Sequence, residues 1–395
     1  MRAVVAVAAL ITAQAHGAKE KRAVAVPAAI IAYGDQAALD RVRNVERWLY
    51  EGGPVPMWWD VASKSDLPPS NKWAELGGGN SKRVRATVYA ARPVVVKEAL
   101  TEEEPHGRQV HGERRKKGAG LEEPGRRLGT SRKKGADGSV KRAARNERNV
   151  QGELLWLEYL RGAPGIPRLH GGFLAANNTR AAMVVQRAGH TLARGKGTRA
   201  SRTELLSEWK AWCHKNPVEA LRAVLVCFRS FAEVGGSFLS DFSPHQFTVT
   251  GDAVYLVDGP VLLEGPLYDV FRERELPTMY TGPPSSCATD AECPVTSQAH
   301  CCCSGESAAT RCEKGARGAP EAAGACDGTC LRVSAKTHVF DVAGKNWAFP
   351  YVISHIKMPP AKKLALRRLQ VWMMRPLVED RPNFTEAIAA LDDIR

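Results

Sequence analysis

No apolar run in this chain is long enough to form a membrane-spanning helix, which needs about 20 consecutive apolar residues. Residues 3–12 form a run that is too short, and the second apolar stretch, residues 23–33, is interrupted by Pro27. Acidic residues are fewer than basic ones: the chain has 42 Asp and Glu and 56 Lys and Arg, so its net charge is +14. We therefore expect no transmembrane span, and an uneven, basic surface.

The short apolar run near the start is typical of a secretory signal instead. Arg2 supplies a positive charge before it, and Ala13-Gln14-Ala15 fits the small-x-small pattern of a cleavage site. We expect residues 1–15 to be a signal peptide that directs the chain to the lumen of the endoplasmic reticulum or Golgi, or to secretion. An uncleaved anchor and a buried N-terminal helix are the alternatives.

Cysteine is scarce outside one segment, because only Cys213 and Cys227 lie elsewhere, where they either pair or stay free. The segment 287–330 holds the other eight cysteines and few large apolar residues. Such a segment needs covalent cross-links to hold one shape, so we predict up to four disulfides of unassigned pairing. A zinc cluster is the alternative, although the paired C-x2-C spacing of zinc sites is not clear. N-glycosylation sequons begin at Asn177 and Asn383, and Asn177, in an apparent loop, is the better acceptor.

The basic excess is concentrated in residues 106–148, which carry 14 Lys and Arg against 5 Asp and Glu. We expect residues 101–146 to be a disordered insertion, because charged, Gly-rich segments with few large apolar residues do not fold alone. Binding of a polyanion, such as an acidic glycan, through this segment is an alternative function. The segment lacks interleaved aromatic residues, so base stacking and sequence-specific nucleic-acid recognition are not expected.

The apolar periodicity predicts a mixed α+β chain. An N-terminal extension, residues 16–72, is expected to be irregular around Trp58 and Trp59 because prolines surround them. Val184-Val185 is typical of a short buried strand. The other expected elements are helices over 35–50, 147–161, 217–234 and from about 339 onward, and strands over 73–97, 246–250 and 253–257.

A glycine-rich turn in the first strand region indicates a phosphate-binding loop. Gly77, Gly78 and Gly79 are followed by Val84, and together they resemble the G-x-G-x-x-G-x-V pattern of nucleotide loops. Glycines let backbone N–H groups approach phosphate, and the valine packs on the base. Lys82 stands where this pattern has its third glycine. A flexible turn without a ligand is the alternative.

Lys97 ends the apolar run 93–96, at a strand–turn–strand distance after the glycine turn. A lysine at this place pins nucleotide phosphates when a carboxylate on the following helix holds it. We predict Glu153 as that partner. Glu147 and Glu158 are the competitors, and Glu158 is expected to face solvent. A solvated lysine at a strand edge is the alternative interpretation of Lys97.

Two aspartates farther along the chain have a spacing suited to phosphoryl transfer. Asp241 is followed by Gln246 after five residues and by Asp258 after 17, with a strand, a turn and a strand between the aspartates. This interval lets both carboxylates converge on one cleft. We predict Asp241 as the base that accepts a hydroxyl proton, Asp258 as a metal ligand and Gln246 as a weaker one. Two unrelated loop aspartates are the alternative.

In this order and spacing, the segments resemble the divergent, cysteine-rich protein-kinase-like proteins of the secretory pathway. The resemblance covers residues 73–395 and includes the start of the cysteine-rich insertion at 286–294. It implies a bilobal protein-kinase-like fold, with a small β-rich lobe, a helical lobe and a disulfide-rich insertion in the helical lobe. It also implies ATP with Mg²⁺ or Mn²⁺ as cofactors.

The same resemblance extends to two structural residues in the C-terminal part of the chain. In the segment 336–347, Asp341 is similar to the aspartate that braces the catalytic loop of kinases from a helix. In the segment 379–384, Arg381 is similar to the arginine that supports the helical lobe. Neither residue is expected to take part in the chemistry.

The chain also departs from the family pattern. Leu239-Ser240 replaces the usual His-Arg before the aspartate, Gly259-Pro260 replaces Phe-Gly, and no A-P-E segment is visible. Besides polyanion binding through residues 106–148, two functions therefore stay open. The first is an enzyme that transfers the γ-phosphoryl group of ATP to a hydroxyl of a protein or glycan acceptor. The second is a pseudokinase that binds a nucleotide or a partner without transfer.

Overall fold

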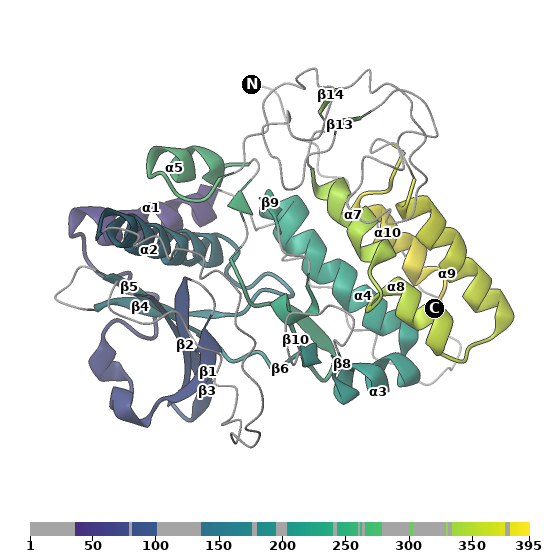
Figure 1. Cartoon of the computed structure of the whole chain (residues 1–395), viewed down its shortest axis with the longest axis horizontal. Coiled ribbons are helices and arrows are strands. Elements are labelled where there is room, and N and C mark those ends of the chain that lie inside the picture. Colours follow the sequence, from purple (N-terminus) through teal and green to yellow (C-terminus); the bar gives the residue numbers. More distant parts are fainter. Residues whose placement is uncertain are drawn as a thin grey trace, which may run out of the picture.

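The computed structural model describes most of the chain from residue 36 onward (Figure 1). The predicted signal peptide, Gly79, the predicted base Asp241, the basic segment up to residue 135 and most of the cysteine-rich segment lie outside the described residues. The described ranges are 36–78, 81–100, 136–175, 180–194, 204–239, 243–259, 261–262, 265–278, 301–302, 329–330, 334–375 and 380–395.

Five strands form one antiparallel sheet in the order β1-β2-β3-β5-β4. Side chains alternate in direction along β3, so Val94 and Val96 pack beside Phe173 on one face, while Val95 packs on the other. Lys97 shares the face of Val95 because it lies two residues further on. The strands are β1 (Ala74–Gly78), β2 (Lys82–Tyr89), β3 (Arg92–Ala99), β4 (Leu169–Ala175) and β5 (Arg180–Gln186).

The helix α2 (Ala136–Tyr159) connects β3 to β4 and packs against the face of the sheet that carries Val95 (Figure 1). It begins earlier than the predicted start at residue 147, so the end of the basic segment is helical. Residues 141–145 are alanine, lysine and arginine, which have high helix propensity, whereas Asp137, Gly138 and Ser139 favour a helix less, so propensity explains only part of the longer helix. The helix thus brings Glu153 behind β3.

The N-terminal extension packs on α2 through α1 (Gln36–Glu51), close to the helix predicted over 35–50. The prediction that Glu158 faces solvent is wrong, because this residue is fully buried. Its carboxylate accepts hydrogen bonds from the indole Nε1 atoms of Trp58 and Trp59, at 3.1 and 2.9 Å, and from the guanidinium of Arg161. These donors come from the extension and from the end of α2, and they satisfy a carboxylate that would otherwise be costly to bury.

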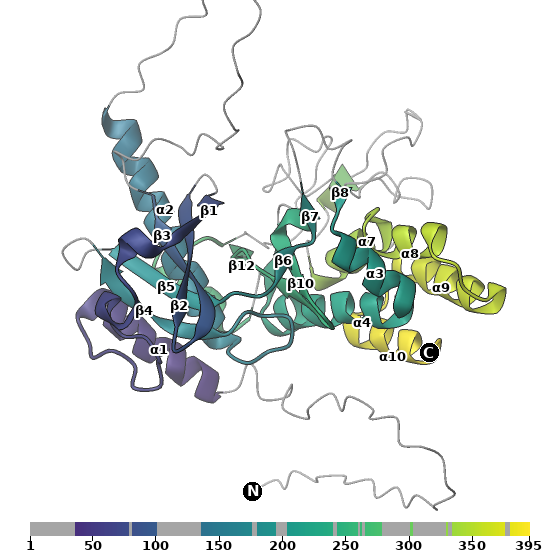
Figure 2. The ribbon, with the colours of Figure 1, turned by 90° about the horizontal axis from the view of Figure 1, so that it is seen from below.

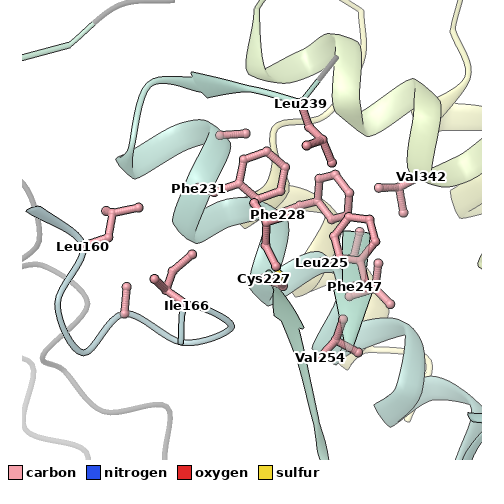
Figure 3. Packing of buried hydrophobic residues seen from close by; sticks show 14 of the residues in the cluster. Leu160, Ile166, Leu225, Cys227, Phe228, Phe231, Leu239, Phe247, Val254 and Val342 are labelled. Carbon is pink, nitrogen blue, oxygen red and sulfur yellow. The ribbon is translucent and has the colours of Figure 1, made fainter. Parts of the chain in front are cut away.

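A mainly helical part lies beside the sheet, and Figure 2 shows β6, β10 and β12 between the two parts. Its core contains Phe228, whose ring lies 4.7 Å from that of Phe231 and 5.3 Å from that of Phe247 (Figure 3). The Phe228 ring also lies 5.7 Å from that of Phe384. The helical elements are α3 (Ser207–Lys215), α4 (Pro217–Phe228), a π-helical turn (Arg229–Val234), α5 (Leu267–Glu273), α7 (Ala335–Gly344), α8 (Phe349–His355), α9 (Pro360–Met373) and α10 (Phe384–Asp392).

Short strands connect the two parts. β10 (Phe247–Thr250) and β11 (Ala253–Leu256) form the hairpin expected near 246–257, and β10 also pairs with β6 (His190–Thr191). β9 (Ser237–Phe238) pairs with β12 (Val261–Leu262). The hairpin and this strand pair carry the backbone on both sides of Asp258.

The described residues also bear on the predictions about a membrane span and about the cysteines. None of the helices within the described ranges is both long and apolar enough to cross a membrane. Cys213 and Cys227 are buried and free, whereas the eight cysteines of the predicted disulfides have no described side chains. The short elements are β7 (Ala193–Arg194) paired with β8 (Glu204–Leu205), β13 (Cys301–Cys302) paired with β14 (Thr329–Cys330), and 3-10 turns over Lys64–Asp66, Ser70–Lys72 and Pro244–Gln246.

Candidate active site

Lys97 and Glu153 meet in a buried ion pair between β3 and α2. The Lys97 ammonium donates to Glu153 Oε1 and to the backbone carbonyl of Val257, which precedes Asp258. The Lys97 and Glu153 side chains are 7% and 2% exposed. Removing Glu153 would leave the buried Lys97 ammonium without a carboxylate partner, which costs about 3–5 kcal/mol, so the pair is firmly held. Lys97 therefore joins the sheet to the backbone after β11.

Lys82, which the sequence presents only as a departure from the glycine pattern, occupies the centre of the same cluster. Its ammonium donates to Glu153 Oε2 and to Asp258 Oδ1. Glu153 therefore binds one ammonium group on each of its two oxygens. Only the position of Lys82 at the third glycine could have indicated this role, because its strand neighbours do not distinguish it from a surface lysine.

The charges of this cluster support one another. Burial favours the neutral form of both Lys82 and Asp258, but their mutual attraction outweighs it. Glu153 and Asp258 together raise the pKa of Lys82 above its ordinary value. The ammonium groups of Lys82 and Lys97, with the backbone N–H of Gly259, lower the pKa of Asp258. All of these interactions favour a charged ammonium on Lys82 and a charged carboxylate on Asp258.

The hairpin β10–β11 and a close approach at Gly259 position Asp258. Val257 N–H donates to the carbonyl of Gln246 at 2.9 Å, and Gly259 N–H donates to Asp258 Oδ1 at 3.0 Å. A Cβ atom at Gly259 would lie 2.9 Å from the Cβ of Glu153. Real Cβ atoms essentially never come that close, so a side chain here would displace α2 from the cluster.

A cavity of about 880 Å³ opens beside the cluster, between the sheet and the hairpin. Its wall combines the charged residues Lys82, Lys97 and Asp258 with apolar side chains, among them Val84 and Val185. This composition suits a ligand with one flat apolar end and one anionic end. A second cavity, of about 550 Å³, lies on the α2 side of the same cluster and is lined by Glu153, Arg145 and Arg148 among others.

The structure brings several of the predicted site residues to one place. Gln246 and Val84 line the large cavity with Lys97 and Asp258. Gly77 pairs with Val84 across β1 and β2, and Gly78 pairs with Arg83, the residue before it. Gly79 and Asp241 lie outside the described residues, so their roles as loop glycine and base stay predictions.

The backbone just before Asp241 is held by a histidine that the sequence analysis did not single out. Leu239 N–H donates to His338 Nε2 on α7 at 3.0 Å, and His338 Nδ1 lies 3.6 Å from Asp341 Oδ2. Asp341 thus lies next to the histidine that contacts the loop backbone. Arg381, as expected of a structural residue, is buried, and its guanidinium lies over the ring of Phe340.

The described residues do not fit a divalent cation as they lie. Asp258 Oδ1, which the resemblance implies as a metal ligand, already accepts from the Lys82 ammonium. Gln246 adds only an amide. Within the described ranges, no group of three or more His, Cys, Asp or Glu side chains could hold a metal ion. The binding of Mg²⁺ or Mn²⁺ stays a prediction.

Comparison with known proteins adds no family to this geometry. No protein-family model matches the chain, and no curated protein matches it in sequence.

Proposed function

We propose that the large cavity binds ATP and that the chain is a kinase-like phosphotransferase acting on hydroxyl groups. The observation that carries this proposal is the buried contact of Lys97 with Glu153 and with the backbone carbonyl before Asp258. A strand lysine, a helix glutamate and an aspartate beyond a distant hairpin are the three groups that kinases use to hold nucleotide phosphates.

The arrangement of the elements also supports a bilobal kinase-like fold. A five-stranded antiparallel sheet, with one helix between its third and fourth strands, lies beside a helical part. The candidate site lies where β2, β3 and α2 meet the hairpin β10–β11. A lumenal or secreted location is part of the same proposal, and it rests on residues 1–15 and on the cysteine-rich segment.

Each part of the site has a role in the proposed reaction. Val84 and Val185 pack against the base, and the Lys97 and Lys82 ammonium groups bind phosphate oxygens. The oxygen of an acceptor hydroxyl attacks the γ-phosphorus, and the bond from that phosphorus to the β–γ bridging oxygen breaks. Asp241 accepts the hydroxyl proton, and ADP leaves with the electron pair of the broken bond. The acceptor is a protein side chain or a glycan.

A pseudokinase is the second candidate, and one contact favours it. Lys82 occupies the Asp258 oxygen that would otherwise be open to a metal ion. A nucleotide bound beside this ion pair would lack the metal that normally neutralises charge during transfer. Such a protein would bind the nucleotide and present a surface to partners without turning the nucleotide over.

Two measurements test the kinase and the pseudokinase together. ATP binding is measured by calorimetry, and phosphoryl transfer is measured as ADP formation. The assay contains Mg²⁺, a peptide library rich in Ser, Thr and Tyr, and separately a mixture of neutral oligosaccharides. Lys97→Met should weaken ATP binding roughly 10- to 100-fold, because it removes charge-assisted hydrogen bonds worth about 1.5–3 kcal/mol. The exposed Lys72→Ala variant, which lies outside the cavity, should behave as the wild type.

Asp241→Asn separates the chemistry from binding. We expect it to keep ATP binding and to lose acceptor-dependent ADP formation, because the amide cannot take the hydroxyl proton. Unchanged turnover in this variant would remove Asp241 as the base. ATP binding without turnover in the wild type would favour the pseudokinase, and no ATP binding would contradict both candidates.

A further inference from the structure

The position of Lys82 matches that of a cation between two carboxylates. Its ammonium lies between Glu153 Oε2 and Asp258 Oδ1 and contacts both. The Lys82 side chain is 11% exposed, and the residue lines both the large and the small cavity. A positive charge with two carboxylate contacts, next to an open cavity, is the arrangement by which nucleotide-binding sites hold their metal ions.

Lys82 and a divalent cation exclude one another at this place. Both would require Asp258 Oδ1, and a cation bound to that oxygen would lie against the Lys82 ammonium. The two positive charges would repel one another, and water would screen this repulsion only in part because the Lys82 side chain is 11% exposed. Lys97 adds a second ammonium on the other oxygen of Glu153 and increases this repulsion.

Both ammonium groups can still bind an anion from the cavity. Each has three N–H donors, and the contacts described for Lys82 and for Lys97 use two of them. Since both lysines line the large cavity, a third donor of each is available to phosphate oxygens there. Two lysine side chains can therefore supply the positive charge that a nucleoside triphosphate requires.

We propose that Lys82 replaces a divalent cation, so that this chain binds a nucleoside triphosphate without metal. This inference rests on the proposed nucleotide site. It goes beyond that proposal, because it assigns the charge compensation to a side chain on β2. It also accounts for lysine at the third glycine position, where a glycine would leave Asp258 without its ammonium partner.

The wild-type protein alone provides the first test. ATP affinity is measured by calorimetry in EDTA and again in excess Mg²⁺. We expect the two dissociation constants to agree within about threefold, a factor that corresponds to less than 1 kcal/mol. A loss of affinity of more than tenfold in EDTA would overturn the proposal and leave the nucleotide site intact. Absence of binding in both media would overturn the nucleotide site together with this proposal.

The Lys82→Gly variant provides the second test, because it restores the usual third glycine of the loop. We expect its ATP affinity in EDTA to fall at least tenfold, and Mg²⁺ to recover most of that loss by occupying the vacated Asp258 oxygen. The control is Arg83→Ala, the next position on the strand, which points to the opposite face and should bind ATP equally in both media. A Lys82→Gly variant that binds as tightly as wild type in EDTA would contradict the proposal, and a thermal unfolding curve verifies that the variant is folded.

Discussion

Glu153 and Glu158 are both buried on α2, yet they bind different partners. Five residues of helix turn the side chains by about 140° relative to one another, so they leave the helix on different faces. Glu153 reaches the lysines of the sheet, and Glu158 reaches Trp58, Trp59 and Arg161. The Glu153 carboxylate therefore belongs to the candidate site, and the Glu158 carboxylate holds the N-terminal extension against α2.

Glu158→Ala should destabilise the protein by about 1–3 kcal/mol, because it leaves the buried indole N–H of Trp59, the partly exposed indole N–H of Trp58 and the partly exposed Arg161 without their acceptor. Denaturant unfolding of the variant against wild type measures the loss. The exposed Glu208→Ala variant on α3 is the control and should change stability by less than about 0.5 kcal/mol. A Glu158→Ala loss below about 1 kcal/mol would show that the extension does not depend on this carboxylate.

Burial raises the pKa of both free thiols, Cys213 and Cys227, to about 12. We therefore expect iodoacetamide at pH 8 to alkylate them at least about 100-fold more slowly in the folded chain than in denaturant, since only the thiolate reacts. Peptide mapping by mass spectrometry gives the two rates, with the unfolded chain as the control. Rapid native labelling of Cys227 would contradict its described burial.

The same pKa shift has a consequence for stability. The unfolded thiols ionise near their usual pKa of about 8.5, whereas the folded thiols do so only near 12. Their contribution is fully present below the unfolded value and is lost as the pH rises toward the folded one. Unfolding free energies measured from pH 8 to pH 11 should therefore decline, and less so in a Cys227→Ala variant.

At the scale of elements, the hairpin between β2 and β3 is unusual. Its two-residue turn consists of Ala90 and Ala91, with φ of 46° and 61°, in the left-handed region that favours glycine and asparagine. A Cβ atom makes this conformation unfavourable by roughly 1–2 kcal/mol per residue. The paired strands hold the turn in place against this cost.

Ala91→Gly should stabilise the chain by about 1 kcal/mol, because glycine adopts this left-handed conformation without strain. The greater conformational entropy of glycine in the unfolded state offsets only part of this gain. The melting temperature and the denaturation midpoint measure the effect. Ala86→Gly, in the interior of β2, is the matched control, and it should destabilise the chain. A loss of stability in Ala91→Gly would indicate that the turn conformation is different in solution.

At the scale of the whole molecule, the candidate site joins two parts of the chain that are distant in sequence. Lys97 lies on the sheet, whereas Val257 and Asp258 follow a hairpin that packs with the helical part. A nucleotide bound here would contact both parts. The two parts should therefore be stabilised together by the ligand.

ATP should raise the melting temperature in one cooperative transition. A ligand at 100 times its dissociation constant adds about 2.7 kcal/mol to the stability of the protein that binds it. Differential scanning fluorimetry of wild type and of Lys97→Met measures the shift, which should be clearly smaller in the variant because its affinity is weaker. Two separate transitions, of which ATP moves only one, would contradict a shared site.

Much of the architecture follows from the sequence because it depends on local patterns. Apolar periodicity located α1 close to its observed bounds, and the turn residues between two apolar runs located the hairpin β10–β11. Glu153, predicted as the partner of Lys97 ahead of Glu147 and Glu158, is the carboxylate that Lys97 contacts. The helical start of α2 was predicted too late, because a highly charged segment does not reveal by composition whether tertiary contacts will continue a helix through it.

By itself, the sequence determined which segments become helices and strands and the order in which Lys97, Glu153 and Asp258 occur, since both depend on neighbours along the chain. Only the tertiary structure decided that Lys82 binds Asp258, that Glu158 is buried and that His338 holds the backbone at Leu239. Each of these depends on a partner 99 to 176 residues away in the sequence and on the exclusion of water around it. The energy of a charged or polar side chain is set by the groups that surround it in space, and no local pattern encodes them.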